Sequence, residues 1–126
     1  MNLRRSTVLT VSVFLMVALA AACGKKSLSP TEAFKALYDA TKKKDAAGIK
    51  KILSKRALSE LEEVAKKDNK PLDEFLVNAN LPDQMPEVRN EKIEGETATL
   101  EIQGRGDNWR PIKFVREDGE WKIDSD

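Results

Sequence analysis

The sequence predicts one α+β domain, in which helices come first and pack on one face of an antiparallel sheet of about four strands. Apolar residues recur at helical spacing as far as Leu76, and from Glu87 onward they alternate with polar residues. The dipeptide Asp118-Gly119 lies between two alternating segments and is a strong signal for a tight hairpin. Helical segments followed by strand segments are typical of the α+β class.

The first helix is expected to begin directly after Ser29. Ser29 can cap it, Pro30 suits the first helical position, and Glu32 completes a capping box. Its apolar face is formed by Phe34, Leu37, Tyr38 and Thr41. The helix should end in the lysines at 42–44, because cations interact favourably with the C-terminal end of a helix dipole.

Three shorter helices should follow, each with a recognisable start. Asp45 and Ser54 are good N-caps for the second and third, and Pro71 opens the fourth. Their apolar positions are Ala46, Ile49, Ile52 and Leu53, then Leu58, Leu61 and Ala65, then Leu72, Phe75 and Leu76. Residues 81–86 contain two prolines and should form an irregular crossing to the sheet.

The first two strands are expected over residues 88–93 and 97–103. The second alternates apolar and polar residues, as a half-buried strand does. A three-residue turn at 94–96 places Val88 on the same face as Ile102, whereas a two-residue turn pairs Val88 with Glu101. We expect the three-residue turn.

The last two strands flank Asp118-Gly119. The third should cover residues 109–116, where Pro111 requires an edge position or a bulge because it has no N–H to donate. A two-residue turn at Asp118-Gly119 predicts two cross-strand pairs on one face, Phe114–Ile123 and Arg116–Trp121.

The first 22 residues have the layout of a secretory signal. Arg4 and Arg5 precede an uncharged, mostly apolar stretch that ends in three alanines. Cys23, the only cysteine, follows at once, and Gly24 comes next. The segment resembles a bacterial lipoprotein signal, which implies that Cys23 is lipidated and becomes the mature N-terminus. The resemblance places the protein in the cell envelope, and Gly24 in place of Asp implies the outer membrane, facing the periplasm, in a Gram-negative host.

Two other interpretations of this segment stay open. One is an uncleaved membrane anchor, since the uncharged stretch approaches the roughly 20 residues that a spanning helix needs. The other is an ordinary signal peptide with a chance cysteine. With lipidation, residues 23–29 form a tether, and its last six residues reach at most about 20 Å. The folded domain would then lie close to the membrane.

Composition excludes several classes of function. The chain has no histidine, which removes the commonest general base and the commonest metal ligand. Loss of residues 1–22 takes two arginines from 22 basic residues and nothing from 21 acidic ones, and near-neutral charge gives no support for nucleic-acid binding. We therefore expect no catalysis, no metal site and no cofactor beyond the covalent lipid on Cys23.

Three segments together resemble a known family. They are the helix opening at 29–38 that runs on to Asp45, the strand pair around 93–100, and the closing hairpin at 114–123. They are similar to those of small, uncharacterised bacterial lipoproteins with a nuclear-transport-factor-2-like, cystatin-like cone. The resemblance implies that residues 30–126 form one cone, in which the first helix and a curved sheet enclose an apolar pocket.

The resemblance also supplies candidate pocket residues, which are Phe34, Tyr38, Phe75, Leu100, Ile102, Ile112, Phe114 and Trp121. Two interpretations of this set are open, because the side chains either fill one another's space as a core or enclose a cavity of ligand size. Enzymes of this fold commonly use Asp–His or Tyr–Asp pairs. Histidine is absent, and the adjacent residues Tyr38 and Asp39 point in different directions on a helix.

Trp109 and Arg110, beside the loop at 104–108, are the candidate contact for a partner. The alternative for Trp109 is a half-buried position at the end of a strand. From the short tether and the lack of catalytic residues, we expect a non-enzymatic envelope domain that binds a partner protein or a cell-wall component. The alternative is a cone that binds an apolar small molecule near the membrane. The sequence does not indicate an oligomeric state.

Overall fold

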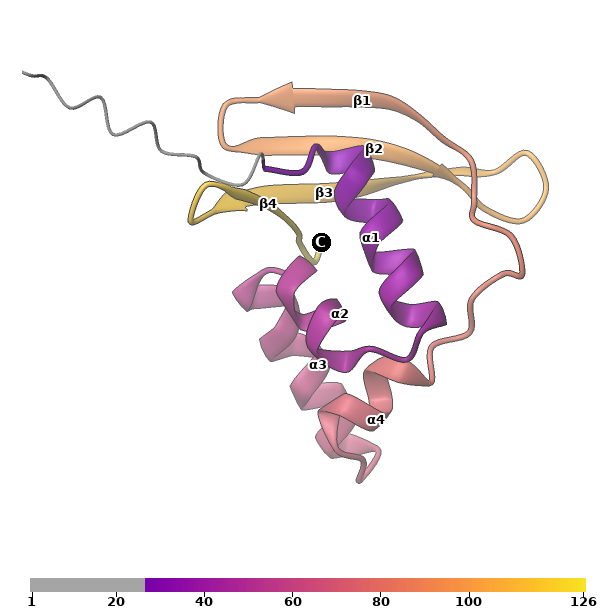
Figure 1. The fold of residues 1–126 in the computed structure, drawn as a ribbon, viewed down its shortest axis with the longest axis vertical. Helices are drawn as coiled ribbons and strands as arrows, with labels where there is room; N and C mark the ends of the chain where they lie inside the picture. The colour runs from indigo at the N-terminus through magenta and orange to yellow at the C-terminus, as the bar shows by residue number, and fades with distance from the viewer. Residues whose placement is uncertain (1–26) are drawn as a thin grey trace, which may run out of the picture.

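In the described part of the chain, four helices precede four strands, as the change in hydrophobic period predicts (Figure 1). The computed structural model describes residues 27–126, so the predicted signal segment and Cys23 lie outside the described residues. The helices are α1 (Pro30–Lys42), α2 (Ala46–Ile52), α3 (Lys55–Lys67) and α4 (Leu72–Val77). The strands are β1 (Val88–Glu94), β2 (Thr97–Gln103), β3 (Trp109–Glu117) and β4 (Glu120–Ile123).

The helix starts follow the local capping signals. At α1, Ser29 Oγ accepts the N–H of Glu32 at 3.1 Å, and the Glu32 carboxylate accepts the N–H of Ser29 at 2.8 Å. Asp45 accepts the N–H of Gly48 in the same way at the start of α2. Each cap satisfies backbone donors that have no partner inside the helix. These helix starts confirm the sequence predictions. They could be predicted because each cap depends only on residues close in sequence.

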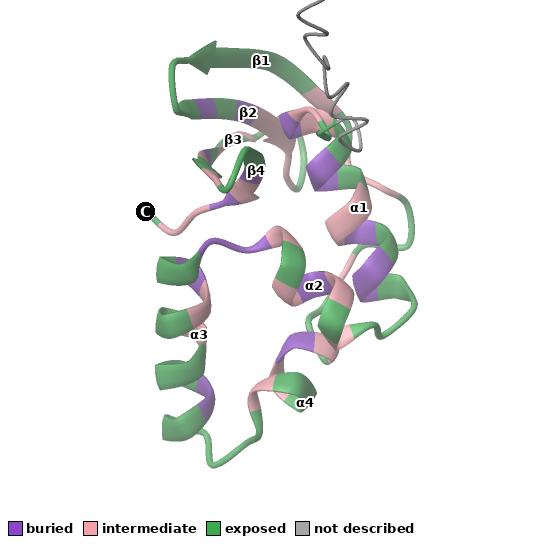
Figure 2. Cartoon of the chain, turned by 60° about the vertical axis from the view of Figure 1, so that its left-hand side comes forward, coloured by how far each residue is buried: buried purple, intermediate pink, exposed green. Residues whose placement is uncertain are grey.

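The strands form one antiparallel meander in the order β1-β2-β3-β4. The predicted α+β class is therefore confirmed. Helix α1 lies across one face of the sheet and α2 contacts β4, whereas α3 and α4 pack mainly on other helices, away from the sheet (Figures 1 and 2). The expectation that the helices pack on one sheet face thus describes α1 and α2, while α3 and α4 build a second, helical part.

The pairing of β1 with β2 reaches the predicted register by a different route. Val88 does face Ile102, but the turn has two residues, Gly95 and Glu96, with Gly95 at a φ of 61°. The register shifts between Arg89 and Lys92 instead, where Asn90 has a φ of 54°. The prediction of a three-residue turn was therefore wrong, because a β-bulge inserts the extra residue that brings Val88 to the apolar face.

The bulge is followed by a contact that fastens the edge strand to α1. One oxygen of Glu91 accepts hydrogen bonds from the Thr31 N–H at 2.9 Å and from the Thr31 hydroxyl at 2.8 Å. Thr31 lies in the first turn of α1, where a carboxylate interacts favourably with the helix dipole. This contact holds β1 against the start of the helix.

The second hairpin is as predicted. Asp118 and Gly119 both have positive φ, at 51° and 78°, as a type I′ turn requires. The observed pairs include Phe114–Ile123 and Arg116–Trp121. Pro111 pairs with Glu101 on the β2 side, while the pairing with β4 stops at Phe114. Pro111 therefore lies on a free edge, where its missing N–H costs no ladder hydrogen bond.

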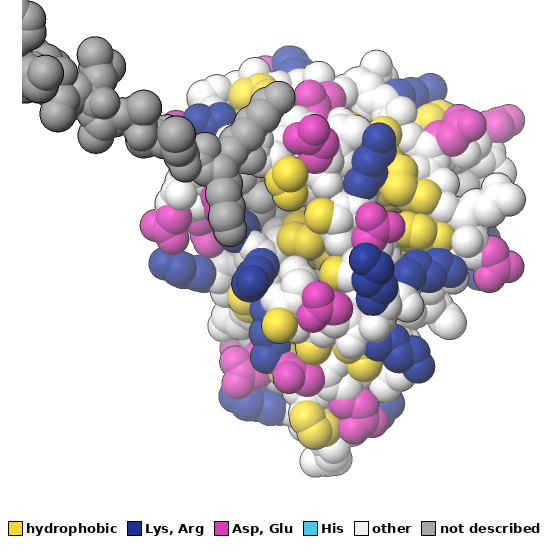
Figure 3. All heavy atoms as spheres, in the orientation of Figure 1, with side chains coloured by type: hydrophobic (Ala, Val, Ile, Leu, Met, Phe, Trp, Pro, Cys, Tyr) yellow, Lys and Arg dark blue, Asp and Glu magenta, His cyan; other side chains and the backbone are white. Residues whose placement is uncertain are grey.

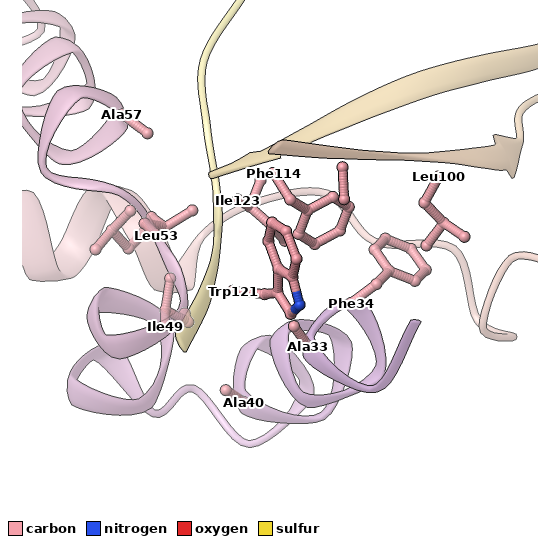
Figure 4. Close-up of a cluster of buried hydrophobic side chains, with 12 residues drawn as sticks. Ala33, Phe34, Ala40, Ile49, Leu53, Ala57, Leu100, Phe114, Trp121 and Ile123 are labelled. Atoms are coloured by element: carbon pink, nitrogen blue, oxygen red, sulfur yellow. The ribbon is translucent and has the colours of Figure 1, made fainter. Parts of the chain in front are cut away.

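The core lies between α1 and the sheet. Figure 4 shows the Phe34 ring pointing toward Leu100, and the Trp121 indole lying between Phe114 and Ala33. Leu100 and Phe114 are each 1 % exposed, so the centre of the sheet is covered on the face toward α1. Apolar burial of this kind is the main favourable contribution to folding.

The link between α2 and α3 is fastened to the end of β4. Ser54 is 0 % exposed, and its backbone N–H donates to the carbonyl of Ile123 at 2.8 Å. Its hydroxyl oxygen accepts the N–H of Ala57 at 3.0 Å and donates its proton to Asp124. Arg56 adds an ion pair with Asp124, with Nη2 and Oδ2 2.6 Å apart. The helical part and the sheet are therefore joined at this point by hydrogen bonds as well as by packing.

Candidate functional site

A partly open apolar pocket of about 340 Å³ lies beside the core. Its walls come from α1, α2, α3 and α4, from residues 79–86, and from Ile102 of β2. Helix α1 contributes Phe34, Leu37, Tyr38 and Thr41, which is the face that the sequence pattern indicates. The pocket exists because α4 and the irregular segment at 78–87 bridge from the helical part back to the sheet, leaving space between themselves and α1.

The eight candidate lining residues divide into two groups. Those that line the pocket are Phe34, Tyr38, Phe75 and Ile102. Those that lie in or against the filled core are Leu100, Ile112, Phe114 and Trp121. Phe34 belongs to both groups, because it is also part of the core cluster. The space between α1 and the centre of the sheet is filled, and the hollow lies toward α4.

Sequence reasoning missed the wall formed by the irregular segment. Ala79, Leu81, Pro82 and Pro86 all line the pocket, although this stretch was interpreted only as a crossing. The sequence does contain a signal for this wall. Several of the eight residues at 79–86 are apolar, whereas an exposed connection seldom has so many apolar residues. No pattern of fixed period marks such a wall, since the segment has no regular secondary structure.

Tyr38 connects the wall of α1 to the irregular segment. Its hydroxyl donates toward the carbonyl oxygens of Pro82, at 2.9 Å, and Asp83, at 3.0 Å. The other polar side chain in the lining is Thr41, whose hydroxyl donates to the Leu37 carbonyl at 2.8 Å. The polar atoms of the lining side chains are thus engaged within the protein, and the pocket presents apolar surface.

Replacing Tyr38 by phenylalanine should loosen this wall while preserving the ring that lines the pocket. We expect a loss of about 1 kcal/mol in the free energy of unfolding, typical for a hydrogen bond, and faster amide exchange in residues 78–87. Hydrogen–deuterium exchange by mass spectrometry measures the second effect directly. Unchanged exchange in that segment, compared with α3 in the same sample, would contradict the role given to the hydroxyl.

Trp109 and Arg110 do not form one contact surface. Successive strand residues point to opposite faces, and Arg110 is paired with Ile102, on the pocket side of the sheet. Trp109 lies half-buried on the outer face, as the alternative interpretation predicts. The Arg89 guanidinium stacks on its ring, 3.9 Å from the centroid. On the face of the molecule drawn in Figure 3, hydrophobic and charged side chains are interspersed.

The same cluster on the outer face contains a well-paired carboxylate. Glu101 accepts hydrogen bonds from Asn90 at 2.6 Å and from Arg89 at 2.9 Å. These bonds, that from Asn90 first, lower the pKa of Glu101 below its ordinary value. A carboxylate held in this way stays ionised and bonded to its neighbours. The cluster therefore has a structural role, and Glu101 is not suited to act as a general acid.

Residues 27–126 contain no group of three acidic, histidine or cysteine side chains placed to hold a metal ion. Over the same range, none of the helices has the length and apolar character needed to cross a membrane. Comparison with known protein families, curated proteins and solved structures gave no match. The chemistry of the site therefore has to be inferred from its own residues.

Proposed function

We propose that the domain binds a small apolar molecule in the pocket between α1 and α4. The observation that carries this proposal is the pocket itself, about 340 Å³ in volume and lined by apolar side chains. Ligand pockets in proteins run from roughly 300 to 1,000 Å³ and are mostly apolar. Because the hydroxyls of Tyr38 and Thr41 already donate to backbone carbonyls, the pocket favours a ligand with little polarity at that end.

Binding without catalysis fits this lining. Among the described residues, Tyr38 and Thr41 are the only ones of the lining with polar side chains, and none contributes a carboxylate, a lysine or an arginine. General acid or base catalysis needs such a group within hydrogen-bond reach of the reacting atoms. We therefore propose a protein that holds its ligand unchanged.

The proposed location is the cell envelope, through lipid on Cys23, at the outer membrane facing the periplasm in a Gram-negative host. The lipoprotein-like signal supports it, with an apolar run ending in three alanines before the only cysteine. A short tether would keep the pocket near the bilayer, where apolar molecules concentrate. We also propose a nuclear-transport-factor-2-like cone as the fold. Its support is the resemblance together with α1 lying across one face of a four-stranded meander.

The anchor has a direct test. The protein purified from its native membrane should have the intact mass of a chain that begins at Cys23 and carries acyl groups, because the Cys23 thiol is the proposed site of attachment. In a Cys23→Ala variant, the acyl mass should be absent. A mature protein that begins elsewhere and carries no acyl mass would contradict the anchor, while leaving the pocket proposal to its own experiment.

Ligand binding is best tested in membranes that hold the full-length protein. An alkane with a diazirine group is added, activated by light, and its attachment sites are found by mass spectrometry. We expect saturable labelling of α1, α4 and residues 78–87. Val64 and Ile93 are exposed hydrophobic residues outside the pocket and report non-specific labelling. Labelling confined to such exposed residues would overturn the proposed function.

A second candidate function is partner binding on the outer face of the sheet. Neither α1 nor α2 covers this face, and Trp109 lies there beneath Arg89. Crosslinking in intact cells should recover a reproducible partner that a Trp109→Ala variant loses. It ranks second because Arg89 and Glu101 already pair with each other there, whereas the pocket is lined by apolar side chains.

A further inference from the structure

A second, larger hollow of about 1130 Å³ adjoins the apolar pocket and shares part of its wall. The two hollows have Leu81, Pro82, Pro86 and Ile102 in common. The second hollow, which we name the polar groove, is also lined by Arg105, by Arg110 and by four residues of the amide type, Asn80, Gln84, Gln103 and Asn108. An apolar site therefore leads directly into one with hydrogen-bond donors and positive charge.

Resting on the function proposed above, we propose that the ligand is a single-chain amphiphile with an anionic head. Its chain would lie in the apolar pocket and its carboxylate or phosphate in the polar groove, against Arg105 and Arg110. This assignment names the class of ligand, which the apolar pocket alone does not do.

The position of Arg110 carries the first part of the argument. Arg110 is the β-ladder partner of Ile102, so both side chains lie on the same face of the sheet. Ile102 lines both hollows, which places the guanidinium of Arg110 beside the junction between them. Gly104 lies next to this guanidinium, since a Cβ on Gly104 would be 3.8 Å from Arg110 Nε, an ordinary contact distance.

Both arginines have free binding capacity. In the part of the chain that the structure describes, neither Arg105 nor Arg110 forms an ion pair or a side-chain hydrogen bond. Other arginines are engaged, such as Arg56 with Asp124 and Arg89 with Glu101. A guanidinium presents several N–H groups in a plane that matches a carboxylate or a phosphate.

Charge in the polar groove favours an anion over a cation. Its lining has two arginines and one acidic residue, Glu87, so one positive charge is left over. The amides add neutral donors around it. A cationic head would meet two guanidinium groups, and an uncharged head would leave them without a new partner.

The size of the apolar pocket favours one chain over two. Its volume of about 340 Å³ lies near the lower limit for ligand sites, which is roughly 300 Å³. Each methylene that passes from water into the pocket should tighten binding about fourfold. The gain should stop at the chain length that fills the pocket.

The test uses diazirine-labelled probes of equal chain length in membranes with the full-length protein. We compare four probes, which are a fatty acid, a lysophosphate, a fatty alcohol and an alkyl trimethylammonium. For each probe, we measure the mole fraction in the membrane at which labelling of the pocket reaches half of its maximum. We expect either anionic probe to saturate at about tenfold lower fraction than the alcohol, consistent with a charge-assisted hydrogen bond. The order of the two anionic probes then identifies the head as carboxylate or phosphate.

Matched variants separate the head site from the chain site. Arg110→Gln should remove most of the preference for the anionic probes and leave alcohol labelling unchanged. Arg116→Gln is the control, because Arg116 is an exposed arginine of the same strand that stacks on Trp121, outside both hollows. Equal saturation by acid and alcohol would overturn the anionic head alone. Absence of pocket labelling by every probe would overturn the proposed function as well.

Discussion

Phe114→Ala is expected to lower the free energy of unfolding by about 3–5 kcal/mol, the range for truncating a buried aromatic residue. The Phe114 side chain is 1 % exposed and packs in the centre of the sheet, next to Trp121 (Figure 4). Its removal would leave a cavity that the four strands and α1 cannot close without moving. Domains of this size are stable by roughly 5–15 kcal/mol, so much of the stability would be lost. Urea unfolding of the full-length protein, followed by pulse proteolysis, measures the change.

Phe75→Ala is the matched control for this prediction. Phe75 is half-buried and faces the apolar pocket, so its ring already lacks close neighbours on one side. We expect the free energy of unfolding to fall by clearly less than in Phe114→Ala, because fewer packing contacts disappear and no new closed cavity forms. Equal losses at the two positions would contradict the description of a filled core beside an open pocket.

Ser54→Ala should cost about 2–4 kcal/mol, although it removes a single oxygen atom. The hydroxyl caps α3, and loss of an N-cap costs about 0.5–2 kcal/mol. It also donates to the Asp124 carboxylate, and a hydrogen bond to a charged group contributes about 1.5–3 kcal/mol. The same urea experiment measures the loss. Ser59→Ala is the control, because Ser59 is an exposed serine of α3 and should change stability by less than about 0.5 kcal/mol.

The Ser54 contact also gives a pH signature. Partial burial raises the pKa of Asp124, but the hydrogen bonds from Ser54 and Arg56, with the Arg56 charge, lower it further, and the net pKa lies below its ordinary value. The stabilisation is therefore complete above the unfolded pKa of about 3.9 and is lost as the pH falls below it. Asp124→Asn should remove this part of the acid sensitivity. An unchanged acid profile in that variant would show that Asp124 contributes nothing to it.

Several elements were predictable because their causes are local. The caps at Ser29, Asp45 and Ser54 and the turn at Asp118-Gly119 depend on a few adjacent residues, and all four are as predicted. The turn between β1 and β2 was not predictable in this way. Its register depends on a bulge at Asn90, and the sequence between Val88 and Gly95 has no strong signal for an extra residue.

Residues distant in sequence meet at the site, and this limits what patterns can predict about it. Tyr38 was a pocket candidate through the family resemblance, but its bond to the carbonyl of Pro82 joins residues 44 positions apart. Arg110 was paired in the prediction with Trp109, its neighbour in sequence. In the fold the two side chains lie on opposite faces, and Arg110 belongs with Ile102 instead.

The sequence by itself determined the order of helices and strands, the α+β class, the helix starts and one hairpin. Those features follow from the hydrophobic period and from hydrogen bonds between residues close in sequence, so they can be predicted from the sequence alone. Only the tertiary structure decided which apolar residues fill a core and which line a pocket. That distinction depends on how far α4 and residues 78–87 lie from α1, and distance between segments is set by packing of the whole domain.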